Sequence, residues 1–137
     1  MIPMQQNGRV SVDLDLKRFV ENIGIKTSVS LGLKEETITV LTSRRKRSVD
    51  RHGSPDFFFS RSDAAEYYLR KGMLIGSYVY SIDDEKLKAY IQVKLSPELV
   101  HSIDGIAKQF STDKHNVSRS AVAEYFLKLG FKSEGLN

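Results

Sequence analysis

The sequence predicts an α+β, mostly α fold in which one small unit occurs twice. A stretch of eighteen residues that begins at Phe57 is nearly repeated from His115, at a constant offset of 58. The second copy is preceded by a strand pattern and a helix pattern. A regular internal repeat of this kind is typical of a duplicated supersecondary unit. Because a unit of about 50 residues buries too little surface to be stable alone, we expect the two copies to share one core.

The repeated stretch predicts a helix in both copies. It runs SRSDAAEYYLRKG in the first copy and SRSAVAEYFLKLG in the second, with apolar residues at helical spacing. Ser60 and Ser118 are suitable N-caps, since a serine hydroxyl accepts a hydrogen bond from the first turn. Gly72 and Gly130 are predicted to end the helices, where glycine is common.

The segment before the second copy changes its hydrophobic period at Ser96. From Tyr90 to Leu95 apolar and polar residues alternate, as in a strand with one buried face. Ser96 followed by Pro97 predicts the start of a helix, which continues to Phe110 with apolar residues three and four positions apart. The predicted order is therefore strand, helix, polar turn, helix.

This order resembles the ribbon-helix-helix family of DNA-binding regulators, and the likeness is carried by YIQVKLSPELVHSIDGIAKQF and VSRSAVAEYFLKLG. In that family two strands pair antiparallel and enter the major groove together. The resemblance implies a tandem ribbon-helix-helix pseudo-dimer with a small antiparallel sheet, formed within one chain as in regulators from viruses of archaea. In the first repeat the likeness is specific only for the second helix.

Two segments compete for the ribbon strand of the first repeat. Thr37–Ser43 (TITVLTS) precedes the Ser60 cap at nearly the spacing found in the second repeat. Val10–Leu14 alternates like a strand but requires an insertion before the repeated helix. We favour Thr37–Ser43, because KTSVSLGLKEETITVLT and GSYVYSIDDEKLKAYIQVKL then form matching hairpins, with extra strands beside the ribbon. The chain divides accordingly into an extension with a strand and a helix (1–25), a first repeat (26–74) and a second repeat (75–137).

The outward residues of the predicted ribbon are candidates for contacts with DNA bases. Tyr90, Gln92 and Lys94 come from the second strand. Thr37 and Thr39 come from the first. Their ring, amide, ammonium and hydroxyl groups suit the base edges of the major groove. The same residues also suit the solvated face of an antiparallel sheet, and it is the repeat with its helix pair that favours DNA.

Basic and hydroxyl residues are candidates for contacts with DNA phosphates. The starts of the two repeated helices offer free N–H groups and a favourable dipole to a phosphate. Their residues are Ser60, Arg61 and Ser62 in the first copy, and Ser118, Arg119 and Ser120 in the second. A basic run adds Arg44, Arg45, Lys46 and Arg47. Such a run predicts that DNA binding weakens steeply with salt.

The sequence has no pattern typical of an enzyme, a cofactor site or a metal site. There is no cysteine, and the three histidines lack the spacing of metal ligands. Glu66 and Glu124 hold equivalent helix positions and are predicted to be solvated or salt-bridged. Without a long apolar run or a signal peptide, the protein is expected in the cytoplasm, or in the host cytoplasm if the source is a virus.

Together these features predict a sequence-specific regulator of transcription that binds double-stranded DNA. The net charge of +4 agrees with an anionic partner. Because a two-stranded ribbon contacts few base pairs, we expect self-association on DNA to lengthen the site. Two alternatives stay open: an antitoxin-like module that binds another protein, and an architectural protein that coats DNA without sequence preference.

Overall fold

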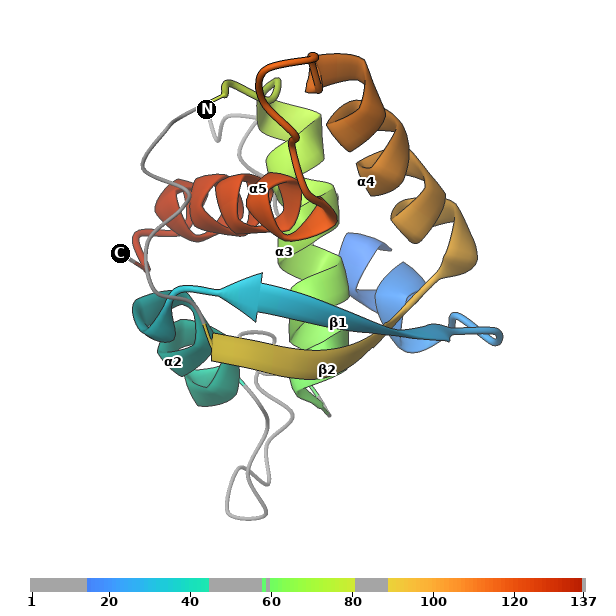
Figure 1. Cartoon of the computed structure of the whole chain (residues 1–137). Coiled ribbons are helices and arrows are strands. Elements are labelled where there is room, and N and C mark those ends of the chain that lie inside the picture. Colours follow the sequence, from blue (N-terminus) through green and yellow to red (C-terminus); the bar gives the residue numbers. More distant parts are fainter. Residues whose placement is uncertain (1–14, 45–57, 59, 81–88, 137) are drawn as a thin grey trace, which may run out of the picture.

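The chain folds as two strand-helix-helix units (Figure 1). The first unit holds β1 (Thr27–Leu33), α2 (Glu35–Ser43) and α3 (Arg61–Ile75), and the second holds β2 (Ala89–Leu95), α4 (Pro97–Phe110) and α5 (Arg119–Ser133). A further short helix over residues 15–21 precedes β1. The predicted α+β, mostly helical fold class and the duplication are therefore confirmed.

The computed structural model describes residues 15–44, 58, 60–80 and 89–136. The candidate strand Val10–Leu14 and three residues of the basic run, Arg45, Lys46 and Arg47, lie outside this part of the chain. No helix within the described ranges is both long and apolar enough to cross a membrane.

The two strands form an antiparallel ribbon with one buried face. Their register runs from Thr27 opposite Leu95 to Leu33 opposite Ala89. Alternate residues point inward, so that the buried set is Val29, Leu31, Leu33, Ile91, Val93 and Leu95. These side chains pack against α3 and α5, which lie on one side of the sheet (Figure 1). The other side of the ribbon is left uncovered by the described helices.

The predicted strand of the first repeat is wrong, because Thr37–Ser43 belongs to α2. The β-branched residues of this segment favour a strand, yet strand propensity is easily overridden by packing. Here Thr37 and Leu41 share the buried face of a helix, and Glu35 and Glu36 occupy its first turn, where the helix dipole favours acidic residues. The strand that pairs with β2 is β1 instead.

The predicted hairpins are wrong for the same reason. Residues 26–42 form a strand followed by a helix, not two strands. Residues 77–80 form no strand, and residues 81–88 are not described. Within the described residues the sheet has two strands and no extra hairpin strands.

The helices α3 and α5 cross in the centre of the molecule at two glycines. A Cβ atom at Gly72 would lie 2.1 Å from the carbonyl oxygen of Phe126. One at Gly130 would lie 2.5 Å from the carbonyl oxygen of Tyr68. Both helices continue beyond these glycines, so the prediction that the glycines end the helices is wrong. Their shared role is to let two backbones approach closely.

Candidate nucleic-acid interface

The outward face of the ribbon carries larger side chains on β2 than on β1. Tyr90, Gln92 and Lys94 are all exposed, as the alternation of the sequence predicted. The register places them opposite Gly32, Ser30 and Ser28 respectively. The Ser28 hydroxyl also donates to the Gln92 side-chain oxygen Oε1 over 3.2 Å. The exposed face therefore presents amide, ammonium and aromatic groups along β2, and serine hydroxyls along β1.

Two of the predicted base contacts do not lie on this face. Thr37 is buried in α2 and donates from its hydroxyl to Glu124 over 2.6 Å. Thr39 is exposed on α2, where its hydroxyl donates to the backbone carbonyl of Glu35. Their predicted places on the ribbon belong to Ser28 and Ser30. The alternation in SVSLGL could have revealed these two serines, but the β-branched TITVLTS nearby is the stronger strand pattern.

The helix starts adjoin the ribbon strands through serine side chains. The Lys94 N–H donates to Ser62 Oγ over 2.8 Å, and the Gly32 N–H donates to Ser120 Oγ over 2.8 Å. Each bond joins the second helix of one repeat to the strand of the other. The start of α3 therefore lies beside β2, and the start of α5 lies beside β1.

The predicted N-caps of these helices are confirmed. Ser60 Oγ accepts from the Asp63 N–H, and Ser118 Oγ accepts from the Ala121 N–H. The backbone N–H groups of the first two residues of each helix donate to no acceptor among the described residues. These are residues 61 and 62 in α3, and residues 119 and 120 in α5. Free N–H groups at the start of a helix are suited to an anion.

The two helix starts differ in charge. Arg119 donates two hydrogen bonds of 2.7 Å to the carboxylate of Asp104 on α4, and these bonds raise the pKa of Arg119. Arg61, its counterpart, forms no ion pair among the described residues. At the α3 start the acidic residue is Asp63, which is paired with Lys26. The guanidinium at α5 is therefore held by Asp104, whereas the one at α3 has no acidic partner among the described residues.

Arg44, a predicted phosphate contact, lies at the end of α2, away from the exposed strand residues of the ribbon. It follows α2 and is partly buried, with its Nε atom enclosed by the protein. Its carbonyl oxygen accepts a hydrogen bond from the Phe58 N–H over 2.9 Å, and its charge acts on the buried hydroxyl of Tyr68. This arginine contributes to the interior rather than to the outward face of the ribbon.

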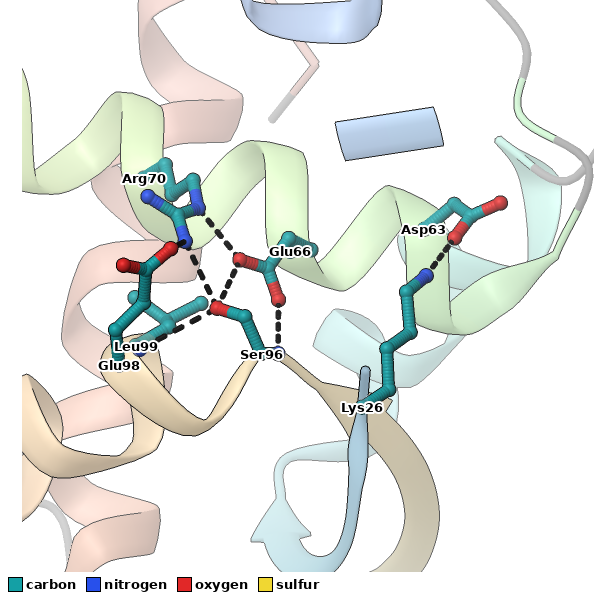
Figure 2. A network of polar contacts seen from close by, with 7 residues as sticks. All are labelled: Lys26, Asp63, Glu66, Arg70, Ser96, Glu98 and Leu99. Carbon is teal, nitrogen blue, oxygen red and sulfur yellow. Dashed lines mark hydrogen bonds and ion pairs between the residues drawn. The ribbon is translucent and has the colours of Figure 1, made fainter. Parts of the chain in front are cut away.

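Glu66 on α3 is buried and holds the end of β2 (Figure 2). One carboxylate oxygen accepts from the Ser96 N–H over 2.8 Å, and the other accepts from the Ser96 hydroxyl over 2.8 Å. The Arg70 guanidinium donates to the same carboxylate, to Ser96 Oγ and to Glu98 on α4. Ser96 in turn caps α4 by accepting from the Leu99 N–H.

Glu124 on α5 repeats this arrangement at the end of β1. It is 1% exposed, and it accepts from the Lys34 N–H over 2.9 Å and from the Thr37 hydroxyl. Lys128 pairs with Glu36 on α2 as Arg70 pairs with Glu98, and this hydrogen bond lowers the pKa of Glu36. We call these two carboxylates the cross-repeat clamps, since each binds the strand-to-helix junction of the other repeat.

The cross-repeat clamps confirm the salt-bridged alternative of one prediction and explain the position of the ribbon. Glu66 and Glu124 are salt-bridged, as predicted, but they are buried rather than solvated. A carboxylate at a helix N-terminus satisfies its free N–H groups and is favoured by the dipole. Because each clamp holds the junction at which a strand ends, the clamps fix the ribbon relative to α3 and α5.

The described part of the chain shows no metal site beside this geometry, and comparisons with known proteins add nothing to it. The described residues contain no cluster of three or more metal-ligating side chains. Comparisons with protein-family models, with curated proteins and with solved structures return no match for the chain. The functional argument therefore depends on the arrangement of the ribbon and the helix starts.

Proposed function

We propose that the protein binds double-stranded DNA by inserting the β1–β2 ribbon into the major groove, as a sequence-specific regulator of the ribbon-helix-helix type. One observation carries the proposal: a two-stranded ribbon is buried on one face, polar on the other, and adjoined by two helix N-termini. The major groove is about 12 Å wide and admits a two-stranded ribbon.

The side chains on the ribbon support contact with base edges. The Gln92 amide can donate and accept together, and the Lys94 ammonium can donate to guanine O6 and N7. Tyr90 adds a ring that can contact a thymine methyl. All three are exposed and lie on one face of β2.

The helix starts support contact with the backbone on either side of the ribbon. A phosphate bound there would meet free N–H groups and the positive end of a helix dipole. Phosphate contacts position a protein on DNA, whereas base contacts give specificity. Because one ribbon spans few base pairs, we expect two or more molecules to bind side by side on a regulatory site.

A matched pair of lysine variants tests the proposal. Lys94→Ala removes an exposed charge from the ribbon, and Lys108→Ala removes an exposed charge from the last turn of α4. That end of α4 lies away from the ribbon (Figure 1). Lys94→Ala should weaken binding to a duplex selected from random sequences by about tenfold, the scale of one good base contact. Lys108→Ala should change it less than about twofold, the scale of an exposed charge outside the interface.

A third variant separates specific binding from coating. The triple variant Arg45→Ala, Lys46→Ala, Arg47→Ala removes much of the basic run. If this variant loses all binding while Lys94→Ala binds normally and no sequence is enriched, the protein coats DNA through its basic run. In that case the ribbon does not enter the major groove.

A further inference from the structure

The two strands differ in how far their outward side chains reach. On β1 the outward positions are Ser28, Ser30 and Gly32, and on β2 they are Tyr90, Gln92 and Lys94. Serine and glycine extend little beyond the backbone, whereas the β2 side chains are long. A ribbon formed by two identical strands would carry the same side chains at both ends, and this ribbon does not.

Gly32 provides the space that the Tyr90 ring occupies. A Cβ atom at Gly32 would lie 2.8 Å from Tyr90 Cε1 and 2.9 Å from Tyr90 Cζ. The ring therefore lies directly against the β1 backbone, yet the residue is 74% exposed. A side chain supported in this way loses less conformational freedom when it binds a partner.

Ser28 has a comparable effect on Gln92. Its hydroxyl donates to Gln92 Oε1, so that the Nε2 group of the amide is directed to other acceptors. In the major groove such acceptors are N7 of either purine, O6 of guanine and O4 of thymine. Gly32 and Ser28 of β1 thus orient Tyr90 and Gln92 of β2.

We propose that β2 alone supplies the side chains that recognise bases, and that Gly32 is a positioning residue that holds Tyr90 for this contact. This inference rests on the proposed binding of duplex DNA. It specifies that the DNA site of one molecule has no two-fold symmetry. The base pair contacted by Tyr90 lies at one end of that site, and the base pair contacted by Lys94 lies at the other.

Variants at Gly32 and Tyr90 test the coupling between them. The wild type is used to select a site from random duplexes, and each base pair of that site is then substituted in turn. For every protein the affinity ratio between the selected and substituted duplexes is measured. Because each ratio compares two duplexes on one protein preparation, an inactive fraction does not affect it.

Tyr90→Ala and Gly32→Ala should lose discrimination at the same base pair, by roughly fivefold or more, which is the scale of a single mismatch. The Gly32→Ala, Tyr90→Ala double variant should discriminate as Tyr90→Ala does, since the added methyl group acts only through the ring. Gly105→Ala is the control, because no atom lies within 4 Å of a Cβ at that position. It should leave every ratio unchanged.

Three results would overturn the inference. If Gly32→Ala keeps the wild-type ratios, or loses discrimination elsewhere than Tyr90→Ala, Gly32 does not position Tyr90. If the base pairs contacted by one molecule form a perfect palindrome, both strands recognise bases alike. In these two cases the proposed binding of duplex DNA stands, whereas a wild-type protein that binds no duplex contradicts both proposals.

Discussion

The two repeats match closely inside the molecule and differ on its surface. Inside, each repeat contributes a glycine to the crossing of α3 and α5, a serine bound to the other strand, and one cross-repeat clamp. On the surface, the outward residues of β1 are small and those of β2 are long. One helix-start arginine is paired with an acid and the other has no such pair within the described chain.

This difference separates the residues that stabilise the fold from the residues that could recognise a partner. The shared contacts join two backbones or bind backbone N–H groups of the other repeat, and both requirements allow few substitutions. The outward positions of the ribbon contact one another and solvent but not the core, so they are freer to diverge. Changes at shared positions should therefore alter stability, and changes at divergent positions should alter binding.

The largest effect is expected at the helix crossing. Gly72→Ala places a methyl group 2.1 Å from a backbone carbonyl oxygen, which no side-chain rotation can relieve. We expect a loss of about 3 kcal/mol or more in the free energy of unfolding, at the upper end for overpacked cores. Gly130→Ala, with its 2.5 Å approach to Tyr68, should be similarly harmful. Chemical denaturation measures both losses.

Gly105→Ala is the matched control for the crossing. Its Cβ would meet no atom within 4 Å, and alanine favours a helix over glycine by about 1 kcal/mol. A small gain in stability is expected. If Gly72→Ala is as stable as Gly105→Ala, the close approach of α3 and α5 is not present in solution.

The next largest effect is expected at the cross-repeat clamps. The groups hydrogen-bonded to Glu66 and Glu124 are all donors. Glutamine replaces one accepting oxygen with an NH2 group, which can only donate and would therefore face another donor. Glu124→Gln should lower the free energy of unfolding by about 2 kcal/mol. Glu66→Gln should lower it by about 3 kcal/mol, because Arg70 also loses its buried charged partner and keeps only the exposed Glu98 among the described acids. Equal stability of either variant and the wild type would contradict the clamp.

A smaller effect is expected from making the two helix starts alike. Asp104→Asn removes the partner of Arg119, whose guanidinium then becomes available as that of Arg61 is. If helix starts contact phosphates, duplex affinity at low salt should rise about threefold. The slope of log affinity against log salt concentration should become steeper by about one, as for one additional phosphate contact. Unfolding should change little, since both groups are partly exposed. Asp113→Asn, an exposed acid before α5, is the control for a simple change in net charge.

The smallest effect is expected from giving α2 the cap that α4 has. Lys34 has the same extended backbone as Ser96 but forms no side-chain cap bond. Lys34→Ser should therefore raise the free energy of unfolding by about 0.5 kcal/mol, at the low end for N-caps. A loss of stability would show that Lys34 has a role in the first repeat that its counterpart lacks.

The second repeat was predictable from the sequence because its local patterns agree with one another. The alternation from Tyr90 to Leu95, the Ser96-Pro97 start and the Ser118 cap all match the structure. In the first repeat the local patterns conflict. The true junction residue, Lys34, lies 26 residues before Ser60, against 22 in the second repeat. Thr42, near the end of the favoured strand Thr37–Ser43, lies 18 residues before Ser60. The favoured strand and β1 therefore depart from the spacing of the second repeat by the same amount, and spacing does not distinguish them.

The start of α2 could not be predicted from the sequence, for a physical reason. The start of a helix is usually recognised in a sequence by a residue whose side chain caps the first turn. In α2 the capping group is Glu124, which binds the Lys34 N–H from 90 residues away. Contacts between Ser62 and β2, and between the two glycines and the opposite helix, are likewise visible only once the repeats are placed together.

The cross-repeat clamps also determine how the protein responds to dilution. Each repeat completes its polar contacts only with groups of the other, so neither half is a finished folding unit. In an assembly of two separate chains, the unfolding midpoint would fall as the protein is diluted. Here the partner is covalently attached, and the midpoint should be independent of protein concentration. A single molecule holds a complete ribbon at any abundance.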